Sequence, residues 1–463
     1  MNGLLSFGLA IGFLALITTV AAVLATRETR RTVLALILLG LLAAALKIFL
    51  FQQAPQWHDI NPDSITYDLN AQAFAEHWRG NAVENQSYHL RGLLAFHAAG
   101  VHGAEWLPGD KLTYSLVIGS HEWLYTGYIA LWYWLSETTQ ALVIWSNALW
   151  AAFFPAAAFG IAHSLGASRR VSLVAAGLAL LDPSAGVNAS WLLKDTLTGF
   201  LAMAALWAML AYLREGGKAR LGIAGLALGG LGCVRFVAFL ALVIAAGMIS
   251  VWLLVRDKSR SRGLAVIAVV FSAWLANGLV AQTPHIAFNG WGGSVNLIGA
   301  LAKPAITVSQ GVGVLRSNPG DLTADDSVLR WKDALVESPV YSIVRSAART
   351  LFAPYPWVAI SPGLNWVSFS ELYYPGVVFW ILCLPGVFAA LVKGLQQREL
   401  GFWLLALFLG ALVAAYTIWL GEWSTRQRVF ALPAFFVLAA MGWAQLFAWA
   451  LGPRTALAPD HKS

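Results

Sequence analysis

Four basic residues stand at the edges of long apolar runs, on the side where topology does not favour a cation. They are Lys194, Arg235, Arg426 and Arg428. Lys and Arg make charge-assisted hydrogen bonds to phosphate oxygens, so four of them together indicate a site for an anionic ligand. Each one alone could instead snorkel to lipid headgroups or pair with a nearby acid, as Lys194 could with Asp195.

An acidic segment between two apolar runs offers a general base. Its Asp59 is followed by Pro62, Asp63 and Ser64, a pattern typical of a helix start, and then by an apolar stripe that begins at Tyr67. A carboxylate beside several cations could accept the proton of an attacking hydroxyl or amine. Asp63 is the first candidate and Asp59 the second, with simple helix capping by Asp63 or Ser64 as the alternative.

Composition shows which elements must position these residues. Of the 463 residues 59% are hydrophobic and 11% charged, whereas roughly a quarter of a soluble domain is charged. A water-soluble globular enzyme is excluded, and residues 1–463 are expected to form a single all-α integral membrane domain. Runs of about 20 apolar residues predict about eleven transmembrane helices. They lie near 3–25, 33–51, 138–162, 171–187, 196–212, 221–234, 236–255, 263–281, 374–392, 401–420 and 429–451.

Charge distribution predicts the orientation. If the spans alternate, 16 of the 30 Lys and Arg residues fall on one side, in short connections, which makes that side cytoplasmic. The N-terminus is then outside and the C-terminus inside. On the outer side lie 18 of the 23 acidic residues and two long loops, 52–137 and 282–373. Any chemistry is expected outside.

Both outer loops contain a segment that predicts a helix lying in the membrane interface. Residues 121–135 are too short to span and rich in Trp and Tyr, and residues 339–357 look similar. In the second segment Arg345 and Arg349 share one helical face, which adds them to Tyr67 and Asp195 as candidates for substrate binding. The loop 282–373 is expected to recognise an acceptor.

Several of these features recur in order along the chain. They are Pro62-Asp63-Ser64 followed by Tyr67, the Tyr- and Gly-containing segment 125–128, Asn147 leading a span, Leu193-Lys194-Asp195, and Arg426 and Arg428 before Pro433. This order resembles the GT-C superfamily of polytopic glycosyltransferases. Within it, the chain is most similar to the bacterial branch of protein mannosyltransferases and lipid A aminoarabinose transferases. The likeness covers roughly 33–215 and 400–450.

The resemblance implies a reaction and its participants. Members transfer a sugar from a polyprenyl-phosphate carrier to an acceptor at the outer face, with an acidic residue of the first outer loop as base. That role falls to Asp63, or else to Asp59, and the four cations would hold the donor phosphate. The expected partners are a polyprenyl-phosphate-linked sugar donor, a lipid, glycan or protein acceptor, and membrane lipids, without nucleic acid. The expected location is the bacterial inner membrane.

No cofactor is predicted. The first loop holds His58, His77, His89, His97, His102 and His121, but their spacing does not match a known metal site, although some GT-C members use a divalent ion. Cys233 and Cys383 lie inside apolar runs, which excludes a disulfide framework and a thiolate metal site. A metal is therefore not expected.

Two other functions remain open. A polymerase or ligase of lipid-linked glycans is one, because the stretch 352–357 resembles segments in membrane proteins of polysaccharide synthesis. A flippase or transporter is the other, although such proteins usually carry repeated halves and ionisable residues near the bilayer midplane. Here the ionisable residues gather at the outer ends of the spans, which favours a one-sided site.

Overall fold

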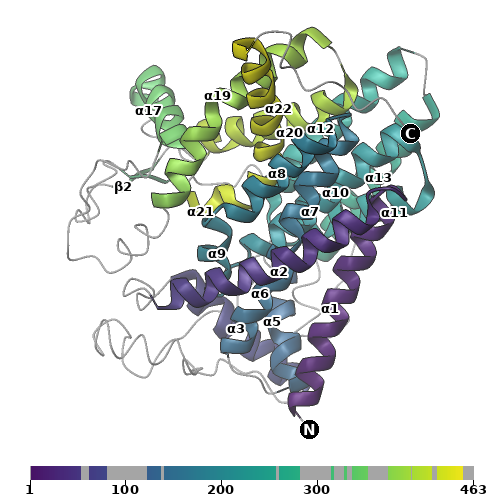
Figure 1. Ribbon diagram of the computed structural model, residues 1–463. Helices are drawn as coiled ribbons and strands as arrows, with labels where there is room; N and C mark the ends of the chain where they lie inside the picture. The colour runs from purple at the N-terminus through teal and green to yellow at the C-terminus, as the bar shows by residue number, and fades with distance from the viewer. Residues whose placement is uncertain are drawn as a thin grey trace.

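Long apolar helices make up most of the structure (Figure 1). The computed structural model describes residues 2–53, 62–80, 123–136, 140–256, 260–281, 314–316, 328–330, 336–352, 374–397, 399–419 and 425–451. Within these ranges, nine helices are long and apolar enough to cross a membrane. The protein is a helical membrane protein, as its composition predicts, because a helix satisfies its own backbone polar groups in lipid.

The elements follow one another in a simple order. The first are α1 (Asn2–Leu24), α2 (Arg30–Gln52), α3 (Pro62–Trp78), α5 (Trp123–Ser136), α6 (Gln140–Ala151), α7 (Phe153–Ser164), α8 (Arg169–Leu181), α9 (Ser184–Ala189), α10 (Asp195–Glu215), α11 (Lys218–Gly232), α12 (Phe236–Val255) and α13 (Arg260–Ala281). Two short antiparallel strands follow, β1 (Val314–Arg316) and β2 (Val328–Arg330). The last are α17 (Pro339–Phe352), α19 (Tyr374–Gln397), α20 (Leu400–Ala414), the π-helix η3 (Ala415–Trp419), α21 (Thr425–Arg428), the 3₁₀ helix η4 (Val429–Ala431) and α22 (Leu432–Leu451).

Two of the eleven predicted spans are not among these nine helices. The prediction of one continuous helix over 171–187 is wrong, because α8 ends at Leu181 and α9 is a separate helix. Pro183 has no amide hydrogen for the helical ladder, and the Asp182 carboxylate accepts bonds from Ser184 Oγ (3.1 Å) and Ala185 N (3.3 Å) at the start of α9. The other, 221–234, corresponds to α11, whose 15 residues fall short of the about 20 needed to cross a bilayer.

The helices differ sharply in how much of their surface the protein covers. In the apolar window of α10, 89% of the residues are buried, whereas in that of α1 only 17% are. The ring of Trp207 on α10 fills the space beside Gly160 of α7, where a side chain would collide with it. Leu42 and Leu46 on α2 are instead exposed, which suits contact with lipid tails of the same polarity. Helix α10 and the span 141–164, whose apolar window is also 89% buried, therefore form the interior of the bundle.

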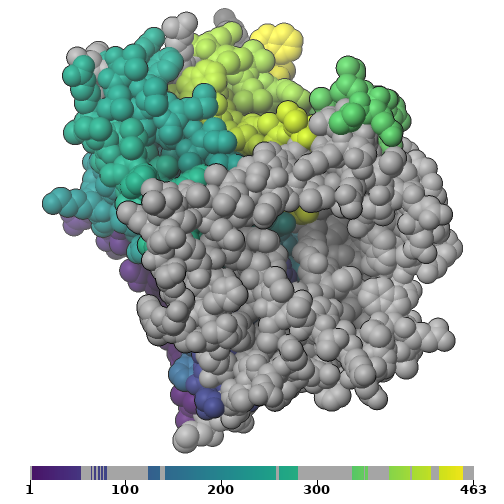
Figure 2. Space-filling view, turned by 180° about the vertical axis from the view of Figure 1, so that it is seen from behind, coloured from purple at the N-terminus to yellow at the C-terminus, as the bar shows by residue number. Residues whose placement is uncertain are grey.

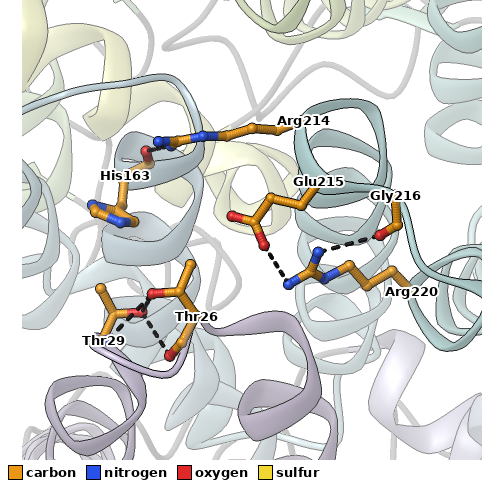
Figure 3. Close-up of polar contacts among 7 residues, drawn as sticks. All are labelled: Thr26, Thr29, His163, Arg214, Glu215, Gly216 and Arg220. Carbon is orange, nitrogen blue, oxygen red and sulfur yellow. Dashed lines mark hydrogen bonds and ion pairs between the residues drawn. The ribbon is translucent and has the colours of Figure 1, made fainter.

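Arginine-rich helix ends meet at one end of the bundle. Arg214, at the end of α10, donates from Nη1 to the carbonyl of His163 in α7 (2.6 Å; Figure 3). Arg262, near the start of α13, donates from Nη1 to the carbonyl of Leu213 (2.7 Å). We call this region the basic end. It is formed by the C-terminal ends of α7, α10 and α12 and by the N-terminal ends of α13 and α20. The loops at this end are ones that the sequence predicts to be cytoplasmic.

Helices α19 and α22 pack closely because each has a glycine at their crossing. A Cβ added at Gly442 would collide with the carbonyl of Gly386. We expect Gly442→Ala to destabilise the protein by about 1–3 kcal/mol, the usual cost of overpacking, measured by thermal unfolding in detergent. Gly410→Ala in α20 is the control, because no atom of the described chain lies within 4 Å of that added Cβ. Equal stability of the two variants would contradict close packing at this crossing.

Helix α17 confirms the helix predicted within 339–357, and it turns its polar side toward the protein. Ser346 Oγ donates to the carbonyl of Thr417 in η3 (2.7 Å), and the hydroxyls of Thr417 and Thr350 are hydrogen-bonded (3.2 Å). Val340 and Val344 point outward and are exposed, and Figure 2 shows α17 in green at the edge of the molecule. An exposed apolar face is what a helix lying in the membrane interface requires.

Candidate functional site

Helix α3 contains the first candidate base. It begins at Pro62, as predicted, because proline fixes φ near the helical value and needs no amide partner in the first turn. Asp63 is the second residue of this helix, four residues before Tyr67, which is buried. The side chain of Asp63 and all of Asp59 lie outside the described residues. The choice between these two carboxylates therefore stays a prediction.

Two buried polar side chains hold the segment that precedes α10. The Asn147 amide donates to the carbonyls of Trp191 (2.8 Å) and Ala189 (3.4 Å). The Ser64 hydroxyl donates to the carbonyl of Leu192 (3.2 Å). Buried carbonyls need such donors, because an unsatisfied one costs about 1–3 kcal/mol. These bonds fix the backbone that leads into Lys194 and tie it to both α3 and α6.

Four predicted site residues come together at the start of α10 and α12. The Lys194 ammonium lies 5.8 Å from the centre of the Tyr67 ring. Asp195 is the first residue of α10, and its carboxylate oxygen Oδ1 lies 2.5 Å from Arg235 Nη1. The Arg235 guanidinium carbon also lies 5.4 Å from the ring centre of Phe430 in η4. The Asp195 side chain is fully buried and that of Arg235 is 12% exposed, so this ion pair is shielded from water.

Arg428, just before η4, is almost fully buried over an aromatic stack. Its guanidinium carbon lies 4.9 Å from the Trp380 ring centre, and Trp380 stacks on Phe435 at 3.7 Å. Trp380 Nε1 donates to the carbonyl of Leu351 in α17 (2.9 Å). Arg428 therefore lies over an aromatic pair from α19 and α22, and that pair is itself bonded to α17. Arg426 belongs to α21, but its side chain lies outside the described part of the chain.

Arg345 and Arg349 both belong to α17. Arg345 is half-buried, and the side chain of Arg349 is not among those described. Their proposed role in substrate binding remains a prediction that rests on the sequence.

Helix α5 confirms the helix predicted over 121–135, but most of its aromatic rings are buried in the protein. Tyr125 packs edge-on against Tyr67 (centroids 5.1 Å apart), and Tyr128 against Phe13 of α1 (5.2 Å). Burial raises the pKa of Tyr128 to about 12, so this phenol stays protonated near neutral pH. Of the aromatic residues with described side chains in α5, only Trp134 is exposed. The helix therefore supports α3 more than it anchors the chain at a surface.

One buried carboxylate escaped prediction. Asp68 is fully buried and accepts bonds from Tyr133 Oη (2.5 Å) and Gln72 Nε2 (2.6 Å). The Gln72 contact follows from i, i+4 spacing on a helix, whereas Tyr133 is 65 residues away and no local pattern points to it. Asp68 locks α3 against α5. Its role is therefore to hold the helix that carries Asp63.

The assembled residues have the chemistry of an anion site. Here the "cation group" means Lys194, Arg235 and Arg428, which come from three separate segments of the chain. Asp195 pairs with Arg235 in this group, and Lys194 and Arg428 are its two further cationic side chains. Fixed donors in a water-poor site stabilise a developing phosphate oxyanion far better than they would in water. The group suits a phosphate leaving group.

No metal site is apparent in the part of the chain that the structure describes. In that part, no three His, Cys, Asp or Glu side chains lie together. The six first-loop histidines lie outside the described side chains, so the structure does not test them.

Comparisons with known proteins do not assign this chain to a family. No protein-family model matches the chain. No curated protein matches it significantly. The functional conclusion therefore depends on the residues of the site and on the resemblance that the sequence motifs carry.

Proposed function

We propose that this protein is an inverting glycosyltransferase that moves a sugar from a polyprenyl-phosphate donor to an acceptor at the outer face of a bacterial inner membrane. The observation that carries the proposal is the meeting of Tyr67, Lys194 and the Asp195–Arg235 pair at one site. These residues come from three segments far apart in the sequence, the helix α3, the start of α10 and the start of α12.

The proposed reaction is a single displacement at the anomeric carbon. The acceptor's hydroxyl oxygen or amine nitrogen forms a bond to that carbon, and Asp63 accepts the proton that this oxygen or nitrogen loses. The bond between the carbon and the phosphate oxygen breaks on the opposite face, and the electron pair stays on the phosphate. The product has inverted configuration. Phosphate is already a good leaving group, so the reaction needs no general acid.

In this proposal the cation group stabilises the departing polyprenyl phosphate. Lys194 and Arg428 supply positive charge, and Arg235 supplies further donors while Asp195 fixes its position. A phosphate monoester carries more charge at departure than in the bound donor, so the stabilisation is greatest in the transition state. The exposed apolar faces of α1, α2 and α17 suit contact with the lipid around the polyprenyl chain.

The proposed orientation places this site outside. The basic end then faces the cytoplasm by the positive-inside rule, with the N-terminus outside and the C-terminus inside. Accessibility of single introduced cysteines at position 2 and position 168 to an impermeant thiol reagent tests this arrangement. Labelling of position 2 alone in intact cells is expected, and labelling of position 168 alone would reverse the orientation.

Donor preference tests the function itself. Purified protein in liposomes is given monophosphate-linked or diphosphate-linked polyprenyl sugars with a mixed pool of lipid and glycan acceptors, and products are identified by mass spectrometry and by anomeric configuration. Transfer from the monophosphate donor with inversion is expected. Transfer only from a diphosphate-linked glycan would favour a polymerase or ligase. Movement of the intact donor across the bilayer without bond cleavage would favour a flippase.

A further inference from the structure

A cavity at the basic end, away from the cation group, has the features of a second binding site. It has a volume of about 180 Å³ and is lined by Ser164, Leu165, Leu210, Leu213, Arg214, Leu253, Arg262, Glu399, Leu400 and Gly401. Liquid water takes about 30 Å³ per molecule, so the cavity has room for a phosphodiester group but not for a large ligand. The helices α7, α10, α12, α13 and α20 that line it all belong to candidate membrane spans. The cavity therefore lies where spans end, at the level of lipid headgroups.

Two arginines face this cavity without a carboxylate partner. Arg214 and Arg262 each donate from Nη1 to a backbone carbonyl, that of His163 and that of Leu213. Neither forms an ion pair with any other residue that the structure describes. The carbonyl contact orients each guanidinium but does not neutralise its charge. Two such charges at one small cavity favour an anion that accepts bonds from both.

Arg220 shows the contrast on the same connection. Its guanidinium pairs with Glu215 (2.6 Å) and also donates to the carbonyl of Gly216 (3.2 Å), as Figure 3 shows. Arg220 therefore has an internal counter-ion, while Arg214, one residue before Glu215, reaches in the other direction to α7. Glu215 therefore neutralises the charge of Arg220, whereas Arg214 keeps its charge at the cavity.

The start of α20 adds backbone donors to the same cavity. Glu399 precedes the helix in an extended conformation and makes no side-chain capping bond, so the first amide groups of α20 have no partner within the helix. Gly401 allows close packing, since a Cβ there would lie 3.0 Å from Leu165 and 3.2 Å from Leu210. The Glu399 carboxylate is exposed at the rim, where water screens its repulsion of an anion.

The floor of the cavity is apolar, which decides between a soluble anion and a lipid. Leu165, Leu210 and Leu253 are buried there beside Leu213 and Leu400. A free phosphate gains nothing from leucine side chains, whereas a phospholipid can bring the apolar part next to its phosphate, the glycerol backbone and the first acyl methylenes, against them. Basic pockets between membrane helices on the cytoplasmic side are suited to anionic headgroups. We propose that this cavity binds the headgroup phosphate of an anionic phospholipid, held by Arg214 and Arg262.

Lipid binding by native mass spectrometry tests the proposal. The full-length protein in detergent is titrated separately with phosphatidylglycerol, phosphatidylcholine and glycerol phosphate. We expect phosphatidylglycerol to bind about tenfold or more tightly than phosphatidylcholine, because the choline of phosphatidylcholine carries a positive charge that Arg214 and Arg262 repel. Glycerol phosphate should bind more weakly than phosphatidylglycerol, because it leaves the leucine floor uncovered. Equal binding of the two lipids, or equally tight glycerol phosphate, would overturn the proposal.

Substitutions assign the preference to this cavity. The double variant Arg214→Gln/Arg262→Gln should bind phosphatidylglycerol no better than phosphatidylcholine. Arg220→Gln is the matched control, and its preference should stay within about twofold of the wild type, because Glu215 already neutralises that charge. Thermal unfolding in the same detergent checks that each variant is folded, and the comparison of lipids on wild-type protein needs no variant. A preference that persists in the double variant would place the lipid elsewhere.

Discussion

Replacing Asp63 with asparagine should lower the rate of sugar transfer by about 10²–10⁴-fold, the usual contribution of a general base. Asparagine has nearly the same shape as aspartate but cannot take up the acceptor proton. The rate is measured with reconstituted protein and a monophosphate-linked donor at saturating concentration. Because the role proposed for Asp63 is to act on the acceptor, the affinity for the donor should remain close to that of the wild type.

Two other carboxylates sharpen this prediction. Glu76→Gln changes an exposed acid on the same helix, which pairs with Arg79 at 2.6 Å, and it should leave the transfer rate unchanged. Asp59→Asn tests the second candidate base. If Asp63→Asn transfers sugar at the wild-type rate while Asp59→Asn is inactive, the base is Asp59. If both variants are fully active, the proposed first-loop base is wrong.

The helical fold could be predicted from the sequence because lipid imposes a simple rule. An apolar run of about 20 residues must be helical to satisfy its backbone, so nine predicted spans have matching helices in the described chain. The break predicted between the runs 221–234 and 236–255 is also present, since α11 ends at Gly232 and α12 begins at Phe236. The helix boundaries within 171–187 were predicted wrongly, because that prediction used hydropathy alone. Leu181 and Val187 have similar polarity, but the intervening Asp182 and Pro183 end one helix and start another.

The partners within the site could not be predicted, for a different reason. The cations were identifiable because they stand on the unexpected side of their spans. Which group each one contacts depends on how distant helices pack, as for Arg428 over Trp380, and no local periodicity records that. The aromatic residues of α5 illustrate the same limit. Tyr and Trp suit a membrane interface as well as a protein core, so their composition predicts a helix but not what covers it.

The Asp195–Arg235 pair gives the second large expected effect. Arg235→Gln should destabilise the protein by about 3–5 kcal/mol, because it breaks the ion pair that Arg235 makes with the fully buried Asp195 carboxylate. Adding Asp195→Asn should recover much of that loss, since a neutral amide pair can still hydrogen-bond. Unfolding of the two single variants and the double variant in detergent gives the coupling energy. The exposed pair Glu76–Arg79, treated in the same way, should show a coupling of less than about 1 kcal/mol.

The double variant also separates the two roles of Arg235, because it is expected to be folded although it lacks the cation. If Arg235 holds the donor phosphate, Arg235→Gln/Asp195→Asn should bind the polyprenyl-phosphate sugar about tenfold or more weakly, the loss expected for one charged hydrogen bond. Wild-type donor affinity in a stable double variant would mean that Arg235 only positions Asp195 at the start of α10. The phosphate would then depend on Lys194 and Arg428, which lie on either side of the pair in the chain. The single variant Arg235→Gln is inactive whether Arg235 stabilises the fold or binds the donor. The donor affinity of the double variant distinguishes these two roles.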